Sequence, residues 1–176
     1  MIRYLSILAF VHCGKPEPLK YHYAPNVSDI DASWSIDAAE MINEKLGCKW
    51  IEISSGILGD NIEFHDREEL RQNGELGDLN EVTKTIRITS YETAPYIFGN
   101  SKSISASDTN GKSGFKRLVI HELGHAMGLS HTDNFDDIMY GCTAEMCNSN
   151  LKNEITKEVW ARYLEQLRKA GVSCPQ

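Results

Sequence analysis

The sequence predicts a single α+β domain. Three longer segments repeat apolar residues at helical spacing. Their order with the strands is strand, helix, four strands, helix, irregular loop and helix, and no linker or repeat divides the chain. Five short segments have the alternating pattern or the β-branched composition of strands: 19–24, 49–54, 61–65, 74–79 and 83–90.

The three helices are predicted at 34–46, 115–127 and 157–170. Each follows a residue that can cap a helix N-terminus and ends beside a glycine, which commonly closes helices. The segment 108–111 (DTNG), just before the second helix, is expected to be a turn. The capping residues and closing glycines are Ser33 and Gly47, Ser113 and Gly128, and Thr156 and Gly171.

The overall charge argues against a nucleic-acid partner. The formal net charge is −7, from 25 acidic and 18 basic residues, and no stripe of basic residues offsets it. An apolar run at 4–11 is too short to span a bilayer, so no transmembrane span is expected.

Residues 1–18 are read as a candidate signal or lipoprotein segment with a short lead-in, and 19–176 as the folded domain. Arg3 and the apolar run after it resemble a short export signal that ends at Cys13. We therefore expect export, to the medium or the cell envelope, with an ordinary cytoplasmic N-terminal segment as the alternative. If Cys13 carries a lipid, an even number of cysteines remains, as two disulfides would need: Cys48, Cys142, Cys147 and Cys174.

The segment 121–131, HELGHAMGLSH, carries the residues of a metal site. His121 and His125 are four residues apart, so on a helix their rings lie about 40° from each other and can converge on one ion. Glu122 lies about 80° from the mean direction of the two rings, within reach of a metal-bound water without being a ligand. Apolar residues of the opposite face are expected in the core: Ile120, Leu123 and Met127.

A third ligand follows a glycine. Gly128 can adopt a positive φ, stop the helix and let the chain return, so that His131 supplies a third imidazole. Three neutral imidazoles leave the fourth position of a tetrahedral Zn²⁺ open to water, which is the arrangement of a catalytic site. A lone histidine on a helix is usually a solvated or core residue, but five fixed positions in one segment make chance occurrence negligible.

This segment is the HExxHxxGxxH signature of the metzincin metallopeptidases, and Met139, eight residues after His131, resembles the methionine turn of the matrixin-like branch. The resemblance implies a metzincin catalytic domain with a twisted, mostly parallel five-stranded sheet, an antiparallel edge strand and three helices. It also implies that Met139 and Tyr140 form the methionine turn, that one zinc ion is bound by the three histidines, and that Glu122 is the general base.

The implied function is a zinc metalloendopeptidase that hydrolyses protein substrates with a zinc-bound water activated by Glu122. An edge strand near 75–80 would hold the substrate as an extended peptide. The enzyme is expected to be a monomer. Structural calcium is left open. The alternatives are a catalytically silent zinc-binding module with the same fold and a zinc hydrolase acting on non-peptide amides.

The chemical state of three cysteines, Cys13, Cys142 and Cys147, is left open, and one of them lies where the sequence departs from the family pattern. Gly141-Cys142 stands where relatives usually carry a proline, and Cys142 is a candidate for a small disulfide with Cys147. The segment 13–17, CGKPE, resembles the Cys-Gly-x-Pro-Asp motif that keeps many matrixins latent, although a propeptide domain is not expected from the twelve residues before Cys13. Cys13 therefore has three candidate fates: lipid attachment, a disulfide or inert thiol, and a zinc latch.

Overall fold

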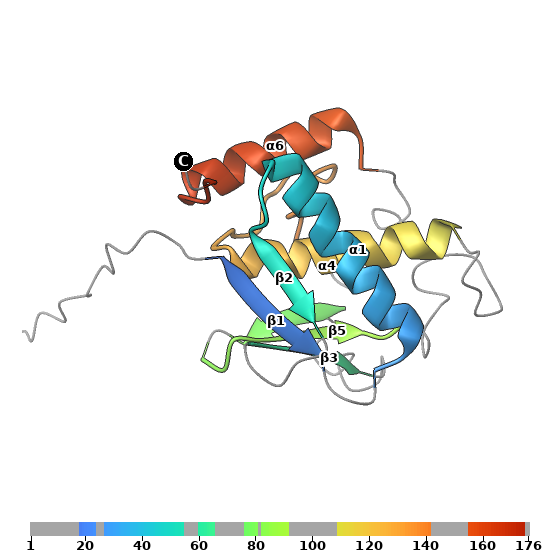
Figure 1. Ribbon diagram of the computed structural model, residues 1–176. Coiled ribbons are helices and arrows are strands. Elements are labelled where there is room, and N and C mark those ends of the chain that lie inside the picture. Colours follow the sequence, from blue (N-terminus) through green and yellow to red (C-terminus); the bar gives the residue numbers. More distant parts are fainter. Residues whose placement is uncertain are drawn as a thin grey trace, which may run out of the picture.

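The computed structural model describes residues 18–23, 27–54, 60–65, 76–80, 82–91, 109–141 and 155–174. Helices and strands follow one another in the predicted order (Figure 1). The α+β class and the three helices are confirmed. The elements are β1 (Leu19–Tyr23), α1 (Asp29–Leu46), β2 (Ile51–Ser54), β3 (Asp60–His65), β4 (Gly77–Asn80), β5 (Thr85–Thr89), α4 (Thr109–Ala126) and α6 (Lys157–Lys169).

The strands form one sheet in the order β2-β1-β3-β5-β4. Strands β2, β1, β3 and β5 run parallel, and β4 pairs with β5 in the antiparallel direction, with Gly77 opposite Ile88. β4 is therefore an edge strand of this sheet, and it contacts α4.

The helices cover the sheet and contact one another. α1 packs against β2 and α4, and α4 also contacts β5 and β4. Three buried aromatic rings join these elements, because Trp34 of α1 lies 4.6 Å from the ring of Tyr91 and 6.1 Å from that of Phe115, measured between ring centroids. This aromatic cluster fixes α4 relative to the sheet.

The start of α1 was predicted wrongly. The N-cap is Ser28, not Ser33, and its hydroxyl accepts a hydrogen bond from the Asp31 N–H at 3.0 Å. The buried carboxylate of Asp31 accepts hydrogen bonds from the Ser90 hydroxyl and from the Tyr91 N–H. Because these partners are some 60 residues away in sequence, periodicity of the helix could not indicate that its first turn is held by the end of β5.

The start of α4 was also predicted wrongly. Residues 109–111, expected in a turn, form the first turn of the helix, so Ser113 is not its N-cap. Tertiary contacts with α1 explain the extension: Lys112 forms an ion pair with Asp37 at 2.6 Å and lies over the ring of Trp34. Packing thus outweighs the turn preference of Asn110 and Gly111.

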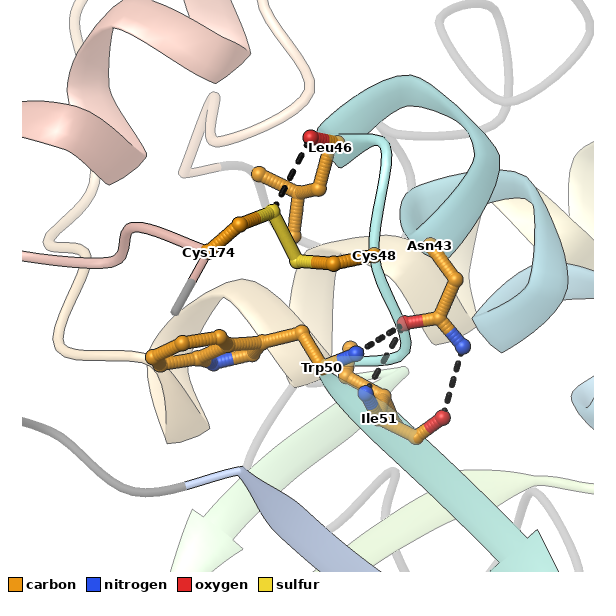
Figure 2. The surroundings of a disulfide bond; sticks show 6 residues. All are labelled: Asn43, Leu46, Cys48, Trp50, Ile51 and Cys174. Atoms are coloured by element: carbon orange, nitrogen blue, oxygen red, sulfur yellow. Dashed lines mark hydrogen bonds between the residues drawn. A yellow bond between two sulfur atoms is a disulfide. The ribbon is translucent and has the colours of Figure 1, made fainter. Parts of the chain in front are cut away.

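A disulfide joins Cys48, just after α1, to Cys174, just after α6, over a sequence separation of 126 (Figure 2). The Sγ atom of Cys174 also lies 3.2 Å from the Leu46 carbonyl oxygen, a contact rather than a hydrogen bond because a disulfide sulfur carries no proton. Beside it, the Asn43 amide oxygen accepts from the N–H groups of Trp50 and Ile51, which fixes the entry to β2. Cys13, Cys142 and Cys147 lie outside the described residues.

None of the helices in the described part of the chain is long and apolar enough to cross a membrane.

Candidate metal centre and active site

Helix α4 presents two histidines on one side and apolar residues on the other. The residues expected in the core are buried: Ile120 and Leu123 are fully buried and Met127 nearly so. His121 and His125 are only partly buried, so they face an accessible side of the helix, as the spacing predicts.

The chain turns back at Gly128. This residue has φ of 89°, a left-handed conformation that residues with a Cβ rarely adopt. The N–H of Gly128 bonds to the His125 carbonyl and that of Leu129 to the Gly124 carbonyl, which closes the helix. His131 then follows on the returning strand of chain and faces the two helical histidines.

The three imidazoles converge on one point. Their Nε2 atoms lie 3.0–3.2 Å from one another, which makes His121, His125 and His131 the one cluster of potential metal ligands among the described residues. A tetrahedral zinc ion with Zn–N distances of about 2.0–2.1 Å would separate its nitrogen ligands by about 3.3–3.4 Å. The donor set therefore fits zinc in both chemistry and spacing.

Backbone carbonyls select the tautomer of the two helical histidines. Nδ1 of His121 lies 2.7 Å from the Ile138 oxygen and Nδ1 of His125 lies 2.8 Å from the Leu129 oxygen. Since a carbonyl oxygen can only accept, each Nδ1 carries the proton and each Nε2 offers its lone pair to the shared point. These two Nε2 atoms lie 3.1 Å apart, so their lone pairs repel each other unless a cation lies between them.

Desolvation, together with the charges of His125 and His131, lowers the pKa of His121 to about 3, against the raising effect of the Ile138 carbonyl. The ring is therefore neutral near pH 7, as a metal ligand must be.

Glu122 is buried, with 2% of its surface exposed, between α4 and the edge strand. It packs against Gly77 of β4: a Cβ atom on that residue would lie 2.6 Å from Oε1 of Glu122. The carboxylate thus occupies space that is available only because position 77 has no side chain. The sequence did not indicate this contact, because the two residues are 45 positions apart.

Met139 lies against the backbone of α4 between the two helical histidines. It is fully buried, and a Cβ on Gly124 would lie 2.5 Å from its sulfur. Tyr140 is half-buried and forms a β-bridge with Thr132, whose N–H donates to the Met139 carbonyl at 2.8 Å. The turn therefore returns the chain beside His131.

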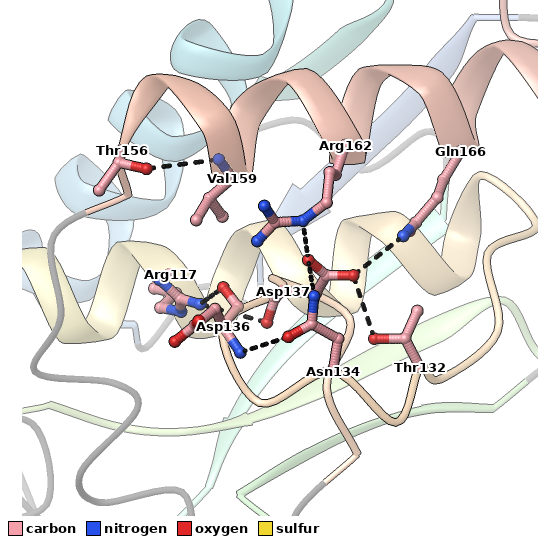
Figure 3. Close-up of polar contacts among 9 residues, drawn as sticks. All are labelled: Arg117, Thr132, Asn134, Asp136, Asp137, Thr156, Val159, Arg162 and Gln166. Carbon is pink, nitrogen blue, oxygen red and sulfur yellow. Dashed lines mark hydrogen bonds and ion pairs between the residues drawn. The ribbon is translucent and has the colours of Figure 1, made fainter.

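A polar network holds this loop between α4 and α6 (Figure 3). The buried Asp137 accepts from Arg162 and Gln166 of α6, while Arg117 of α4 donates to the backbone carbonyls of Asp136 and Asp137. No pattern in the sequence predicted a role for these residues. One signal was present: Arg117 lies three residues before Ile120, so helical spacing places its charge near the apolar face, and a buried charge requires a partner.

Histidines that converge from one helix and the turn after it, in an α+β fold, are the arrangement typical of zinc metallopeptidases of the metzincin type. The fold is similar to that of an archaemetzincin from Methanopyrus kandleri, with a TM-score of 0.52 and 12% sequence identity over 90% of this chain and 99% of that one. A zinc-dependent peptidase from Methanocorpusculum labreanum also matches, with a TM-score of 0.49 and 11% identity over 82% of this chain and 99% of that one.

The family model for matrixins matches residues 20–163, and the chain belongs to this family. No curated protein matches the sequence significantly. The resemblance drawn from the sequence motifs is thereby confirmed, and the protein is a zinc metallopeptidase.

Proposed function

We propose that the protein is an endopeptidase that cleaves protein substrates, with one zinc ion held by His121, His125 and His131 and with Glu122 as general base. The observation that carries the proposal is the convergence of three Nε2 atoms, two of them deprotonated by the carbonyl contacts of Nδ1, beside the buried carboxylate of Glu122. When bound, zinc would supply Lewis acidity, lowering the pKa of water and polarising a carbonyl.

The residues of the chain supply the remaining steps. Glu122 would take a proton from the attacking water and later deliver it to the leaving amine. Its packing against Gly77 supports this role, because it fixes the carboxylate on the helix that carries His121 and His125, where a general base must lie within reach of the water it activates. Met139 and Tyr140 would form a methionine turn that supports the histidines from below.

The substrate would bind along β4. This strand pairs with β5 on one side only in the described sheet, so its other edge can accept an extended peptide by β-augmentation. Binding of an extended backbone favours unfolded segments and exposed loops of proteins as substrates.

The first prediction tests the chemistry. We expect Glu122→Gln to lower kcat by about 10²–10⁴-fold on a peptide library, because the general base is lost while the metal ligands remain. Zinc content, measured by atomic absorption, should stay at one ion per chain. In contrast, His125→Ala should lose both zinc and activity.

A Glu122→Gln protein that still cleaves the library at the wild-type rate would refute the assignment. A wild-type protein that binds zinc and cleaves no peptide would instead favour a silent zinc-binding module.

We further propose that the protein is exported and monomeric. The Cys48–Cys174 disulfide supports export, because disulfides persist mainly in oxidising compartments. Mass spectrometry of the mature protein decides the fate of Cys13, which would be lipid-modified in an anchored protein. An intact Cys13 thiol in an unprocessed and fully active chain would rule out both the lipid anchor and the zinc latch.

A further inference from the structure

Two of the three metal-binding imidazoles are connected to the same short loop. The Nδ1–H of His121 donates to the carbonyl of Ile138. His131 is followed directly by Thr132, whose N–H donates to the carbonyl of Met139. The orientation of the His121 ring and the position of the backbone beside His131 therefore depend on where residues 137–139 lie.

The carboxylate of Asp137 is the centre of the contacts that hold this loop (Figure 3). Its side chain is 8% exposed and forms an ion pair with Arg162 of α6. It also accepts hydrogen bonds from Asn134 at 3.2 Å and from Gln166 and Thr132 at 3.5 Å each. One carboxylate thus joins α6 to the residue after His131.

The backbone on both sides of the Asp137 side chain is also fixed. The Arg117 guanidinium donates to the Asp136 carbonyl at 2.9 Å and to the Asp137 carbonyl at 3.2 Å. Desolvation lowers the pKa of Arg117, and the charges of Asp136 and Asp137 oppose that effect. The loop is therefore held from α4 by an arginine on its backbone and from α6 by an arginine on its carboxylate.

Loss of the carboxylate would affect His121 through one peptide group. The Ile138 carbonyl belongs to the peptide that follows the one joining Asp137 to Ile138, so rotation of the loop changes its direction. The χ2 torsion of a histidine has a broad energy profile, and the acceptor at Nδ1 is what selects the ring angle and the tautomer. A displaced Ile138 carbonyl would leave His121 without a fixed orientation.

We propose that Asp137 is a positioning residue of the metal centre, orienting His121 through the Ile138 carbonyl and His131 through Thr132. His125 serves as an internal reference, because its Nδ1–H donates to the Leu129 carbonyl at 2.8 Å and not to this loop. The inference rests on the proposed zinc site, but it does not require that the protein cleaves peptides.

The first test measures zinc affinity of the full chain by competition with a chromophoric chelator. Asp137→Ala is expected to weaken zinc binding about 10–100-fold, the range found when the outer partners of metal ligands are removed. Arg162→Met, which removes the cation from α6, should weaken it in the same direction. Since both changes remove the same ion pair, the double variant should bind zinc only slightly more weakly than Asp137→Ala alone.

Thr156→Ala is the matched control. It removes the N-cap of α6, where the Thr156 hydroxyl accepts from the Val159 N–H, and so destabilises the same helix without touching the loop. Its zinc affinity should equal that of the wild type. If Thr156→Ala weakens zinc binding as much as Asp137→Ala does, the effect is one of general stability and the proposal is wrong.

A second test uses the metal-free protein. Nitrogen NMR of the imidazoles should show His121 and His125 as single tautomers protonated at Nδ1 in the wild type. In Asp137→Ala, His121 should become a mixture of tautomers while His125 keeps its signals. Unchanged His121 signals together with unchanged zinc affinity would overturn the proposal.

Two further outcomes are separable. If Asp137→Ala does not fold, the same measurements on Asp137→Asn and on Arg162→Met decide, because each of these leaves part of the network in place. If the wild type binds zinc but cleaves no peptide, the proposed function fails while the zinc affinities still test the role of Asp137.

Discussion

At the scale of single residues, the contact between Gly77 and Glu122 links the edge strand to the active-site helix. Few residues fit at position 77, because the space of a Cβ is filled by the glutamate side chain. The strand that is proposed to bind substrate therefore also limits where the general base can lie. A side chain at position 77 would displace the carboxylate of Glu122.

The prediction for this contact is that Gly77→Ala displaces the Glu122 carboxylate. A misplacement of about 1 Å in a catalytic group can lower the rate by about 10²-fold. We therefore expect Gly77→Ala to lower kcat by roughly 10–100-fold. Zinc content should not change, because the ligands do not contact Gly77 in the described structure. Steady-state kinetics with a fluorogenic peptide measures the effect.

The control for Gly77→Ala is thermodynamic. The substitution should reduce the free energy of unfolding in the wild type by about 1–3 kcal/mol, as overpacking does, but much less in a Glu122→Ala background, where the space is free. Equal losses in both backgrounds would mean that the glycine serves the strand itself and not the glutamate.

The residues of the metal site could be predicted because they lie within eleven positions of one segment, 121–131. Helical periodicity and one glycine are enough to bring three imidazoles together. Gly77 and Asp137 could not be assigned in this way. Their roles depend on contacts with other elements, and a glycine at the start of a strand or an aspartate in a loop does not differ by type from an ordinary turn residue.

At the scale of elements, the ends that were predicted well are those with local causes. Thr156 caps α6 through its own hydroxyl, and Gly128 ends the active-site turn by its positive φ. The starts of α1 and α4 depend on Asp31 and Lys112, whose partners come from distant segments. Local patterns cannot report such contacts, so both helices were predicted too short.

Helix α6 docks on α4 through Tyr163, and this contact gives a prediction for high pH. The buried Tyr163 hydroxyl donates to the Ile120 carbonyl at 3.0 Å, and burial raises the pKa of this phenol far above its usual value of 10.0. The folded state thus keeps a proton that the unfolded chain loses above pH 10. The stabilisation is complete below pH 10 and decreases as pH rises, by about 1.4 kcal/mol per pH unit.

Urea denaturation at pH 9 and pH 11 tests this prediction by comparing the wild type with Tyr163→Phe. At pH 9 the variant should be less stable by about 0.5–1.5 kcal/mol, because it lacks the hydrogen bond to Ile120. At pH 11 the difference should shrink or reverse, since phenylalanine has no proton to lose. A difference that stays constant between the two pH values would contradict the burial argument.

At the scale of the whole molecule, the disulfide joins the C-terminal ends of the first and the last helix. Cys48 follows α1 and Cys174 follows α6, two elements that also contact each other directly. The sequence indicated only that an even number of cysteines would remain if Cys13 were lipidated. An even number of cysteines does not determine which of them form a disulfide. The Cys48–Cys174 bond depends on the packing of α6 near the end of α1, and no local sequence pattern indicates this packing.

Closing a loop of this length should make the disulfide a large contributor to stability. The chain-entropy model gives on the order of 5 kcal/mol for a loop of about this size, and measured losses are typically 2–5 kcal/mol. We therefore expect the double variant Cys48→Ser/Cys174→Ser to lose about 2–5 kcal/mol of unfolding free energy. The metal site should still bind zinc at temperatures where the variant is folded, because neither cysteine contacts the histidines in the described structure.

Reductant provides the control that isolates this bond from the other cysteines. Dithiothreitol should lower the denaturation midpoint of the wild type to near that of the double variant and leave the midpoint of the double variant unchanged. A further decrease in the double variant would reveal a second stabilising disulfide, for which Cys142 and Cys147 are the candidates. Identical midpoints for the wild type with and without reductant would show that the Cys48–Cys174 bond does not constrain the unfolded chain.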